Sequence, residues 1–430
     1  MTTDSTFPIR VLHTLDTYLE TTQNWIYPQI ACVPRTETAI LCRQLDNSSE
    51  FPMIGRPFFI QEHSRKERGF VSRVPGAVSF RGFVSRVPGA ASFRSRMLRA
   101  RKRMLRAKTL AEVWRWRPAI VHAHFGMSGW QSLGLRRRLR IPLITSFYGL
   151  DAWSLPVTEP SWRDQYVQLF REGDLFLVEG PAMRSRMVEI GCPTDKLRIR
   201  RLGVDSTKIA FAQPDFSDNL KIAMVGRFVQ KKGLVDGLRA CALAARAGVH
   251  LQVTIIGDAY PNSAPSQAIK QELLVLSQSP ELLNRVHFTG FSPPSQVHSL
   301  LRQNNLLLCP SKHSSDGDAE GGMPFVLAEA MAMGLIGVGS RHCDMAELII
   351  DRTSGYLFDE GNIEQLADLL KKISCATNDL APIAAAARKH VEENFNLSRQ
   401  LTILSEIYYD IATRRRPEYG ERYRSGQGER

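Results

Sequence analysis

The sequence lacks the patterns that mark membrane-spanning, secreted or metal-binding proteins. No apolar run reaches the ~18 residues that a membrane-spanning helix needs, and Asp4 stands where a secretory signal peptide would be basic. The seven cysteines are scattered, with no C-x-x-C pair and no paired-histidine spacing. Neither a zinc site nor a disulfide framework is expected from such cysteines. These absences predict a cytoplasmic protein.

A dinucleotide-binding fingerprint is also missing. Residues 9–15 form an apolar-rich run that fits a first strand, yet no G-x-G-x-x-G follows it. Glycines at that spacing let a pyrophosphate approach the first helix, so their absence counts against a nicotinamide-dependent enzyme. With 430 residues, 43% of them hydrophobic and 23% charged, the chain has the composition of a globular protein of two or three domains. Two domains is the simpler expectation.

Positive charge is confined to one segment. The chain carries a net charge of +13, and residues 65–108 alone hold fourteen Lys or Arg and one acid, so the remainder is formally neutral. A charge this concentrated describes one segment and not the fold, and we expect no nucleic-acid partner. The segment contains a direct repeat, RGFVSRVPGAVSF at 68–80 and RGFVSRVPGAASF at 81–93, followed by RMLRA at 96–100 and 103–107.

Two hypotheses account for this basic segment. Two copies are too few for a solenoid, so the repeat is read first as a duplication inside a tolerant surface loop. Alternatively, residues 96–113 have the apolar spacing of a basic amphipathic helix, which together with the loop would hold the protein against an anionic membrane surface. The protein would then be peripheral on the inner face of the membrane.

Apolar runs alternate with helical patterns along the rest of the chain. This alternation is typical of a parallel α/β sheet. A polar loop with Pro214 between the two series of runs is the expected domain boundary. The predicted strands are 9–15, 119–124, 143–147 and 175–179, then 221–225, 252–256, 286–288, 306–309 and 336–339; helical patterns cover 25–30, 130–139, 162–170 and the residues from 234.

Residues 311–334 are the centre of the functional prediction. A buried strand at 306–309 is followed by a Gly-rich loop, by Pro324 at the expected first helical turn, and by good helix formers with Glu329 one turn inside. Unpaired backbone N–H groups and the helix dipole would both point at a ligand there. The segment therefore predicts either an anion or sugar site or, equally, a solvated acidic connection.

Two further groups of polar residues follow predicted strands. Arg227 and Lys232 come directly after the strand at 221–225, and two cations beside a helix start suit a diphosphate. They could equally form a solvated basic turn. His122 and His124 flank Ala123 at the end of another strand. This H-x-H pattern suggests a metal only weakly, because no third ligand is evident, and we expect none.

Together these segments resemble glycosyltransferase family 4, a family of retaining enzymes with the GT-B fold, and especially its bacterial polysaccharide-assembly branch. The resemblance covers about residues 10–409 without the repeat. It is carried by VHAHFG and SFYGLD in the N-terminal half, and by GRFVQKKG, IIGDA, VHFTGF, EGGMPFVLAEAMAMG and SGYLF in the C-terminal half.

The resemblance implies two Rossmann-like doubly wound domains that face a cleft. An acceptor-side domain would cover 1–205, with the basic insert at 65–108, and a nucleotide-sugar-binding domain would cover 206–392. A helix at 393–413 would pack back on the N-terminal domain, before a flexible tail at 414–430. The expected activity is retaining transfer of a sugar from a nucleotide-sugar to a saccharide or lipid-linked acceptor, with no metal and no cofactor besides the nucleotide-sugar substrate.

The resemblance also implies a role for individual residues. Arg227 and Lys232 match the residues that hold the donor diphosphate, and Glu329 matches the glutamate that binds the ribose. Glu320 resembles the glutamate facing the transferred sugar, and His124 the active-site histidine. The implied sets are His124, Glu320, Arg227 and Lys232 for catalysis; Gly226, Arg227, Lys232, Glu320, Gly321, Gly322, Met323, Pro324 and Glu329 for donor binding; and Tyr148 and Asp151 on the acceptor side.

Two departures from the family pattern lie in this region. Eight residues separate Glu320 from Glu329 where the family has seven, and His342, Cys343 and Asp344 occupy the positions around the usual Gly-Gly. Two other functions remain open: a catalytically weak GT-B homologue that acts as a binding protein, and a nucleotide-sugar epimerase on a similar fold.

Overall fold

The computed structural model describes residues 8–19, 21–45, 50–52, 58–60, 104, 107–216, 219–376 and 380–414. The direct repeat at 68–93, most of the basic segment and the predicted tail beyond residue 414 lie outside the described residues. Of the predicted basic helix at 96–113, the structure describes only residue 104 and the part from 107, which is helical as far as residue 116.

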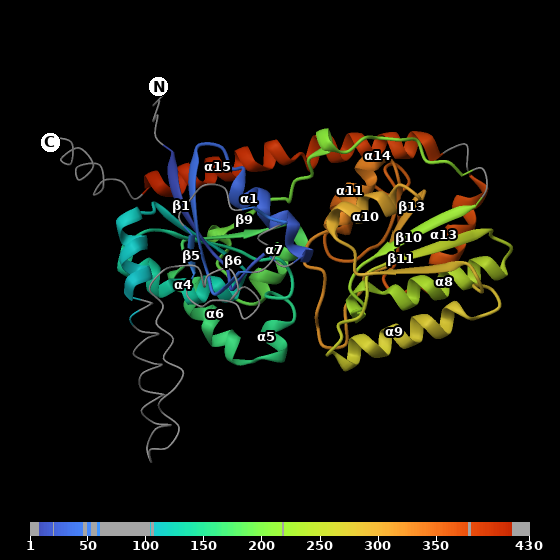
Figure 1. Cartoon of the computed structure of the whole chain (residues 1–430), viewed down its shortest axis with the longest axis horizontal. Helices are drawn as coiled ribbons and strands as arrows, with labels where there is room; N and C mark the ends of the chain where they lie inside the picture. Colours follow the sequence, from blue (N-terminus) through green and yellow to red (C-terminus); the bar gives the residue numbers. More distant parts are fainter. Residues whose placement is uncertain are drawn as a thin grey trace, which may run out of the picture. The chain divides into compact units, whose positions relative to one another are not determined.

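Within the described residues the first sheet has seven strands in the order β5-β3-β1-β6-β7-β8-β9 (Figure 1), and the pairs β3·β5, β1·β3, β1·β6 and β8·β9 run parallel. The four strands predicted in this half are confirmed to within one residue, whereas β3, β5 and β9 were not predicted. The strands are β1 (Ile9–Thr14), β3 (Thr36–Cys42), β5 (Phe58–Ile60), β6 (Ile120–His124), β7 (Leu143–Ser146), β8 (Leu175–Val178) and β9 (Leu197–Ile199); β2 (Thr17–Tyr18) and β4 (Gln44–Leu45) pair separately.

The second sheet has six parallel strands in the order β12-β11-β10-β13-β14-β15. Five of them follow the prediction closely. In β10, β11, β13 and β14 most of the apolar side chains are buried, whereas the edge strand β12 is only partly buried. The strands are β10 (Leu220–Val225), β11 (Leu251–Ile256), β12 (Val286–Gly290), β13 (Leu306–Cys309), β14 (Ile336–Ser340) and the unpredicted β15 (Tyr356–Phe358).

The helices connect these strands, as in a doubly wound sheet. Their bounds are α1 (Tyr27–Ala31), α4 (Gly126–Leu139), α5 (Leu155–Thr158), α6 (Ser161–Glu172), α7 (Pro181–Glu189), α8 (Leu234–Arg246), α9 (Ala264–Ser277), α10 (Pro294–Leu301), α11 (Phe325–Met333), α12 (Met345–Leu348), α13 (Ile363–Cys375), α14 (Leu380–Asn394) and α15 (Leu397–Arg414). Short 3-10 turns are η1 (Thr21–Ile26), η2 (Thr194–Lys196), η3 (Ser206–Lys208) and η4 (Gln230–Lys232).

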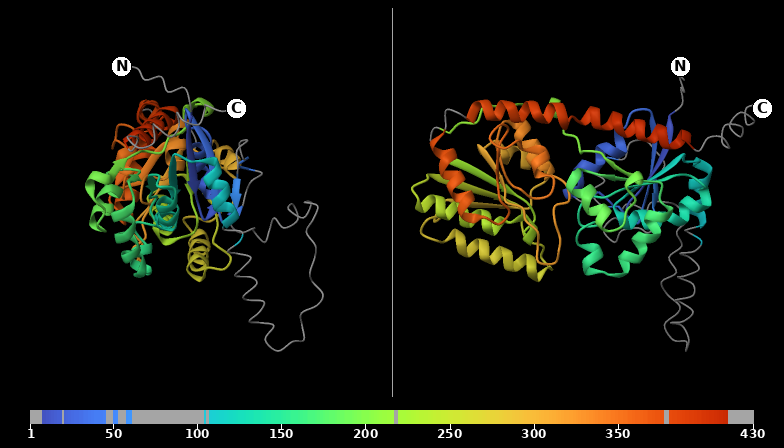
Figure 2. Two further views of the ribbon diagram at one scale, coloured as in Figure 1. Left: turned by 90° about the vertical axis from the view of Figure 1, so that its left-hand side faces the viewer. Right: turned by 180° about the vertical axis from the view of Figure 1, so that it is seen from behind.

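The second sheet is covered on both faces. The yellow-green α8 packs between α13 and the yellow α9, and α11 packs against α14 and strands β13 and β14 (Figures 1 and 2). Leu238 of α8, Leu308 of β13 and Leu370 of α13 all belong to one buried apolar cluster. Burying one such leucine contributes roughly 1.5–3 kcal/mol.

The first sheet also carries helices on both faces. Side chains along β1 alternate between the faces. Thr14 meets α4, where its hydroxyl lies 2.9 Å from that of Ser132. His13 meets α15, with its ring 6.5 Å from the ring of Tyr408. The carboxyl end of β1 therefore brings a histidine and a threonine to opposite sides of the same sheet.

By its internal contacts the chain divides into one unit of residues 1–145 with 405–430 and another of 146–404. The change from the first sheet to the second falls between Ile199 and Leu220. The predicted domain limits at 205, 392 and 413 stay predictions.

Each sheet reverses its strand order once, between β1 and β6 in the first and between β10 and β13 in the second. Ligands of doubly wound sheets bind beyond the carboxyl ends of the strands at this reversal. The segments that carry the predicted site residues leave these strands: His124 ends β6, Arg227 follows β10, and Glu320 follows β13.

Candidate active site

Gly233 joins the lysine turn after β10 to the loop after β13. It has φ of +60°, and a Cβ at this position would lie 1.8 Å from the carbonyl oxygen of Pro310. Only glycine fits this conformation and this approach. The contact places η4, with Lys231 and Lys232, directly beside the loop that carries Glu320.

Lys232 and Glu320 form a partly buried ion pair. The ammonium lies 2.9 Å from the Glu320 carboxylate, which also accepts a hydrogen bond of 2.8 Å from the hydroxyl of Ser311. Burial raises the pKa of Glu320, but the charges of Lys232 and Lys231 together with these hydrogen bonds outweigh it and lower the pKa to about 2. Glu320 is therefore an anion at neutral pH, able to accept hydrogen bonds from hydroxyl groups and unable to donate a proton.

Two more cations, Lys231 and Arg227, lie on the same segment of the chain as Lys232. Lys231 is buried, where its ammonium contacts the Asp318 carboxylate at 2.9 Å and the carbonyl oxygen of Ala319 at 3.0 Å. The Lys231 ammonium therefore stabilises the loop that contains Asp318 and Ala319. The guanidinium of Arg227 donates to the hydroxyl of Tyr260 at 2.9 Å and lies 5.8 Å from the centre of that ring. Tyr260 thus orients Arg227.

The loop at Glu320 presses against residues that follow β7 and β8. Gly321 has φ of +89°, and a Cβ there would lie 2.4 Å from the Cα of Gly149, so the two backbones touch. A Cβ on Gly322 would overlap the carboxylate of Glu179 at 1.8 Å. Burial raises the pKa of Glu179 well above its usual range, although the charge of Arg200 opposes it. Both predicted glycines are therefore required by packing, whatever they contribute to a ligand.

His342 and Glu360 support Glu320 and were missed by the sequence analysis. The N–H of Glu320 donates to Nε2 of His342 at 3.2 Å, and Nδ1 of His342 lies 2.8 Å from Glu360. Glu360 also accepts from the N–H of His313 at 2.6 Å. These residues lie just beyond β14 and β15, so the rule that parallel strands end at one edge could have found them once β15 was recognised.

Cys343 and Asp344 complete this turn. The Cys343 thiol accepts the N–H of Gly321, and burial raises the pKa of that thiol to about 12. A carboxylate oxygen of Asp344 accepts the N–H of Ala182 at 2.7 Å, at the first turn of α7. The residues that occur around the usual Gly-Gly position thus satisfy backbone donors from neighbouring loops.

Glu329 lies in α11 and contacts His298 of α10, with 3.0 Å between Oε1 and Nε2. The Glu329 carboxylate raises the pKa of His298 despite partial burial. The helix begins at Phe325, and Pro324 precedes it with extended backbone at ψ of 116°. The prediction of Pro324 in the first helical turn is therefore one residue early, because its ψ is not helical. Met323 is buried. A Cβ added to Gly226 would lie 3.1 Å from the side chain of Lys232, so the backbone of Gly226 lies close to that side chain.

The predicted acceptor-side residues are buried. The carboxylate of Asp151 accepts the N–H groups of Tyr148 at 3.0 Å and Gly149 at 3.1 Å, and the Asp151 carbonyl oxygen accepts the hydroxyl of Tyr166 at 2.6 Å. Asp151 therefore folds the loop that carries Gly149 against Glu320 and Gly321. Its contacts make it a residue that shapes the site.

His124 belongs to a buried cluster of three histidines in the first unit. Its Nε2 lies 2.9 Å from Nδ1 of His13, and Nδ1 of His122 lies 2.6 Å from the hydroxyl of Tyr408. Burial lowers the pKa of His13 to about 3, so His13 is neutral. Because His124 has no exposed surface, contact with a substrate requires its side chain or the residues covering it to move.

His13 is a third potential metal ligand beside the H-x-H pattern, so the expectation that no third ligand accompanies His122 and His124 is wrong. His13, His122 and His124 each offer a ring nitrogen within 4.8 Å of the others, and so do His313, His342 and the sulfur of Cys343. A ligand needs a free lone pair, however. Nε2 of His342 accepts an N–H and Nδ1 meets Glu360, while His13 and His124 are hydrogen-bonded to each other. As arranged, both groups are hydrogen-bond networks.

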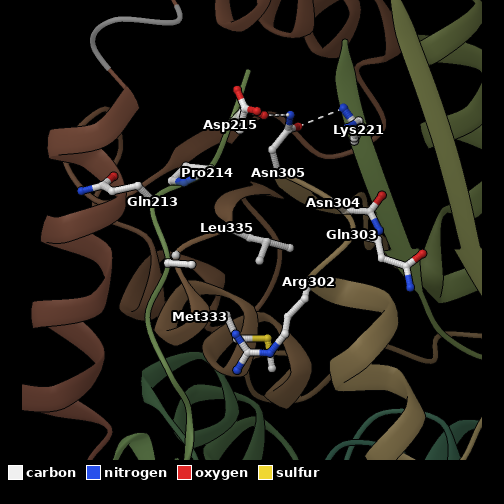
Figure 3. Close-up of a pocket in the computed structure, with 12 residues that line it drawn as sticks. Gln213, Pro214, Asp215, Lys221, Arg302, Gln303, Asn304, Asn305, Met333 and Leu335 are labelled. Carbon is white, nitrogen blue, oxygen red and sulfur yellow. Dashed lines mark hydrogen bonds between the residues drawn. The ribbon is translucent and has the colours of Figure 1, made fainter. Parts of the chain in front are cut away.

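A pocket of about 290 Å³ lies at the amino ends of the strands of the second sheet, opposite the carboxyl ends that carry the predicted site (Figure 3). It opens near the amino ends of β10 and β13, at Lys221 and Asn305. The Asn305 amide donates to the carbonyl oxygen of Asp215 at 2.7 Å, and its oxygen accepts the N–H of Lys221 at 2.9 Å. This pocket holds none of the predicted site residues and lies away from the carboxyl-end site.

Sequence comparison with known proteins identifies the family of this chain. Residues 205–390 match the family Glycosyl transferases group 1, and residues 62–208 match Glycosyltransferase Family 4. The amylovoran biosynthesis glycosyltransferase AmsK of Erwinia amylovora is 32% identical over 296 residues, which cover 68% of this chain and 70% of AmsK. The chain belongs to glycosyltransferase family 4. The putative colanic acid biosynthesis glycosyltransferase WcaL of Escherichia coli (strain K12) is 33% identical over 301 residues, 67% of this chain and 70% of WcaL.

Solved structures agree on the fold. The Anabaena protein HepE, solved in complex with UDP, superposes with a TM-score of 0.69 at 17% identity and covers 94% of this chain and 100% of HepE. Sucrose-phosphate synthase from Thermosynechococcus elongatus gives a TM-score of 0.69 at 14% identity, over 94% and 99% of the two chains. The predicted GT-B fold of this family 4 glycosyltransferase is confirmed. Within the described residues, its helices include none with the length and apolarity to span a bilayer.

Proposed function

We propose that this family 4 glycosyltransferase transfers a sugar from a nucleotide-sugar to a saccharide or lipid-linked acceptor in the assembly of a cell-surface polysaccharide, with retention of the anomeric configuration. The single observation that carries the proposal is the Lys232–Glu320 pair, held at the strand reversal of the second sheet with Arg227 on the adjoining segment. The names of AmsK and WcaL, which refer to amylovoran and colanic acid, support the polysaccharide class.

The proposed roles follow from charge. Lys232 donates to Glu320 and has three N–H donors in all, so it can share its charge with a donor phosphate. Arg227 would bind phosphate oxygens in pairs. Together they would stabilise the charge that develops on the leaving diphosphate, without a metal ion. Ionised Glu320 would accept hydrogen bonds from hydroxyl groups of the transferred sugar, and Glu329 would accept hydrogen bonds from the hydroxyl groups of the ribose.

The roles of the remaining residues are also proposals. Backbone groups of Gly226, Gly321, Gly322, Met323 and Pro324 would line the donor. Tyr148 and Asp151 would act on the acceptor side by shaping the loop at Gly149, and His124 would lie near the reacting sugar. The UDP and UDP-glucose bound by HepE in its solved structures make a uridine nucleotide the first donor to test.

The decisive experiment joins a binding screen to a product analysis. Free UDP, GDP and ADP are screened by thermal shift, where a ligand at 100 times its Kd adds ~2.7 kcal/mol of stability. The matching nucleotide-sugars are then offered with saccharide acceptors, and the anomeric configuration of the product is read by NMR. An inverted product would refute retention. A changed sugar without any acceptor would indicate an epimerase, and binding without turnover would indicate a binding protein.

The basic segment is proposed as the membrane contact. Each Lys or Arg close to an anionic surface contributes ~1 kcal/mol, falling off within a Debye length of ~8–10 Å. Four or five such charges from 65–108 would give reversible attachment to the inner face of the membrane, where a lipid-linked acceptor would be reached.

A further inference from the structure

We propose that His342 and Glu360 are positioning residues of the donor site, which hold the backbone of Glu320 through an oriented histidine. The inference rests on the proposed donor role of Glu320. It also gives a physical role to a histidine in the segment where this chain departs from the Gly-Gly pattern of the family.

The tautomer of His342 follows from its partners. Nε2 of His342 faces the N–H of Glu320 at 3.2 Å, and a backbone N–H can only donate. Nε2 must therefore accept, which leaves the ring proton on Nδ1. Nδ1 lies 2.8 Å from Oε2 of Glu360, a carboxylate that accepts it. The chain of hydrogen bonds runs in one direction, from Glu320 through His342 to Glu360.

Glu360 is itself held in place. Its Oε1 accepts the N–H of His313 at 2.6 Å, and Nδ1 of His313 lies 3.0 Å away. Partial burial raises the pKa of Glu360, but the hydrogen bonds from His313 and His342 lower it overall. The carboxylate stays ionised at neutral pH, so it fixes the His342 tautomer.

The supported backbone has little other freedom. The Glu320 side chain is tied to Lys232 and Ser311, and Gly321 lies against Gly149. His342 is the group that meets the Glu320 N–H itself, with a side chain that has no exposed surface. Losing this bond would let the peptide before the carboxylate turn while the fold around it remains intact.

Asparagine and glutamine at position 342 test separately the two hydrogen bonds of His342, the one to the Glu320 N–H and the one to Glu360. His342→Gln places an oxygen near the position of Nε2, which accepts the Glu320 N–H. His342→Asn places an amide N–H near the position of Nδ1, which donates to Glu360 but leaves the Glu320 N–H without an acceptor. The matched control is His250→Gln, the same chemical change at an exposed histidine.

Residue-resolved hydrogen exchange of the Glu320 amide tests the proposal without any substrate. In His342→Asn we expect the Glu320 amide to exchange up to about tenfold faster than in the parent, because one hydrogen bond is lost. In His342→Gln and His250→Gln its exchange rate should remain near that of the parent. A His342→Gln variant that exchanges as fast as His342→Asn would overturn the proposal, as would parent-like exchange in both. Should His342→Asn fail to fold, the ¹⁵N shifts of His342 in the parent decide, because a proton on Nε2 contradicts the arrangement.

Turnover then connects the contact to catalysis. With the nucleotide-sugar identified above, His342→Asn should lower kcat while the affinity for the free nucleotide stays unchanged, since Glu320 is expected to face the sugar. Glu360→Gln should fall between parent and His342→Asn. If no donor is turned over by the parent, the proposed function fails, while the exchange experiment still tests the hydrogen bond.

Discussion

Replacing Asp344 with asparagine should stabilise this protein, and only at pH values above the pKa of the carboxyl group. Asp344 is 3% exposed, and its Oδ1 accepts the N–H of Ala182 at 2.7 Å while Met183 donates a second hydrogen bond. Among the described residues its Oδ2 has no hydrogen-bond partner. The amino end of α7 favours a negative charge by ~0.3–1 kcal/mol, yet burial outweighs this and raises the pKa of Asp344 from 3.8 to about 6.

The raised pKa fixes both the sign and the pH window. Because the folded chain holds this proton more tightly than the unfolded chain, ionising Asp344 costs stability as the pH rises from about 4 to 6. A shift of about two units corresponds to ~3 kcal/mol. The introduced asparagine amide would keep the Oδ1 contacts, but its NH₂ group would also lack a partner, which costs ~1–2 kcal/mol. The net gain for Asp344→Asn should be ~1–2 kcal/mol at pH 8 and vanish or reverse near pH 4.

Urea unfolding of the parent and Asp344→Asn from pH 4 to 8 measures this difference directly. Asp359→Asn is the control, because the Asp359 side chain is 62% exposed and its replacement should leave a small difference at every pH. A difference for Asp344→Asn that does not change with pH, or one that falls as the pH rises, would refute the assignment of a buried carboxylate whose pKa is raised. The Asp344→Ala variant should be less stable than the parent, because it loses the hydrogen bonds that the Asp344 carboxylate accepts from the N–H groups of Ala182 and Met183.

Four further predictions concern function. Arg227→Ala should lose ~2–4 kcal/mol of transition-state stabilisation, so an unchanged kcat/KM would exclude Arg227 from the diphosphate site. Glu329→Gln should weaken free nucleotide more than Glu320→Gln does in calorimetry, and the opposite order would exchange their roles. His124→Ala should lower kcat and leave nucleotide affinity unchanged, whereas equal losses in both, or none, would speak for a purely structural histidine. The full chain should float with anionic but not neutral vesicles, losing this at high salt and on deletion of 68–108; equal flotation of the deleted protein would exclude the segment as the anchor.

The local features of the sequence predicted the central elements of the fold. Strand β13 has the predicted bounds, and helix α11 begins one residue after the predicted Pro324, because a short apolar run and a stretch of good helix formers are properties of neighbouring residues. Lys232 and Glu320 were each assigned to the donor site. Their ion pair could not be predicted, since it depends on Gly233 bringing two loops together that lie far apart in the chain.

What the sequence could not supply was the pairing of distant segments. Glu360 was missed because β15 has only three residues, too few to show a period. His13 was missed as a neighbour of His122, because that contact follows from the parallel register of β1 and β6. Asp151 matched a family motif, but its buried hydrogen bonds within the loop became visible only in three dimensions.

The contact of Gly149 with Gly321 has a mechanical consequence. Two backbones that touch with no side chain between them act as a rigid coupling, so a shift of Glu320 on binding a ligand would displace the loop that ends at Asp151. Trp153 stands two residues further along, with its ring 5.3 Å from His313 and 5.0 Å from the Arg186 guanidinium. Motion of this loop would therefore change the surroundings of the Trp153 indole, and the fluorescence of a variant that keeps Trp153 as its single tryptophan would measure it.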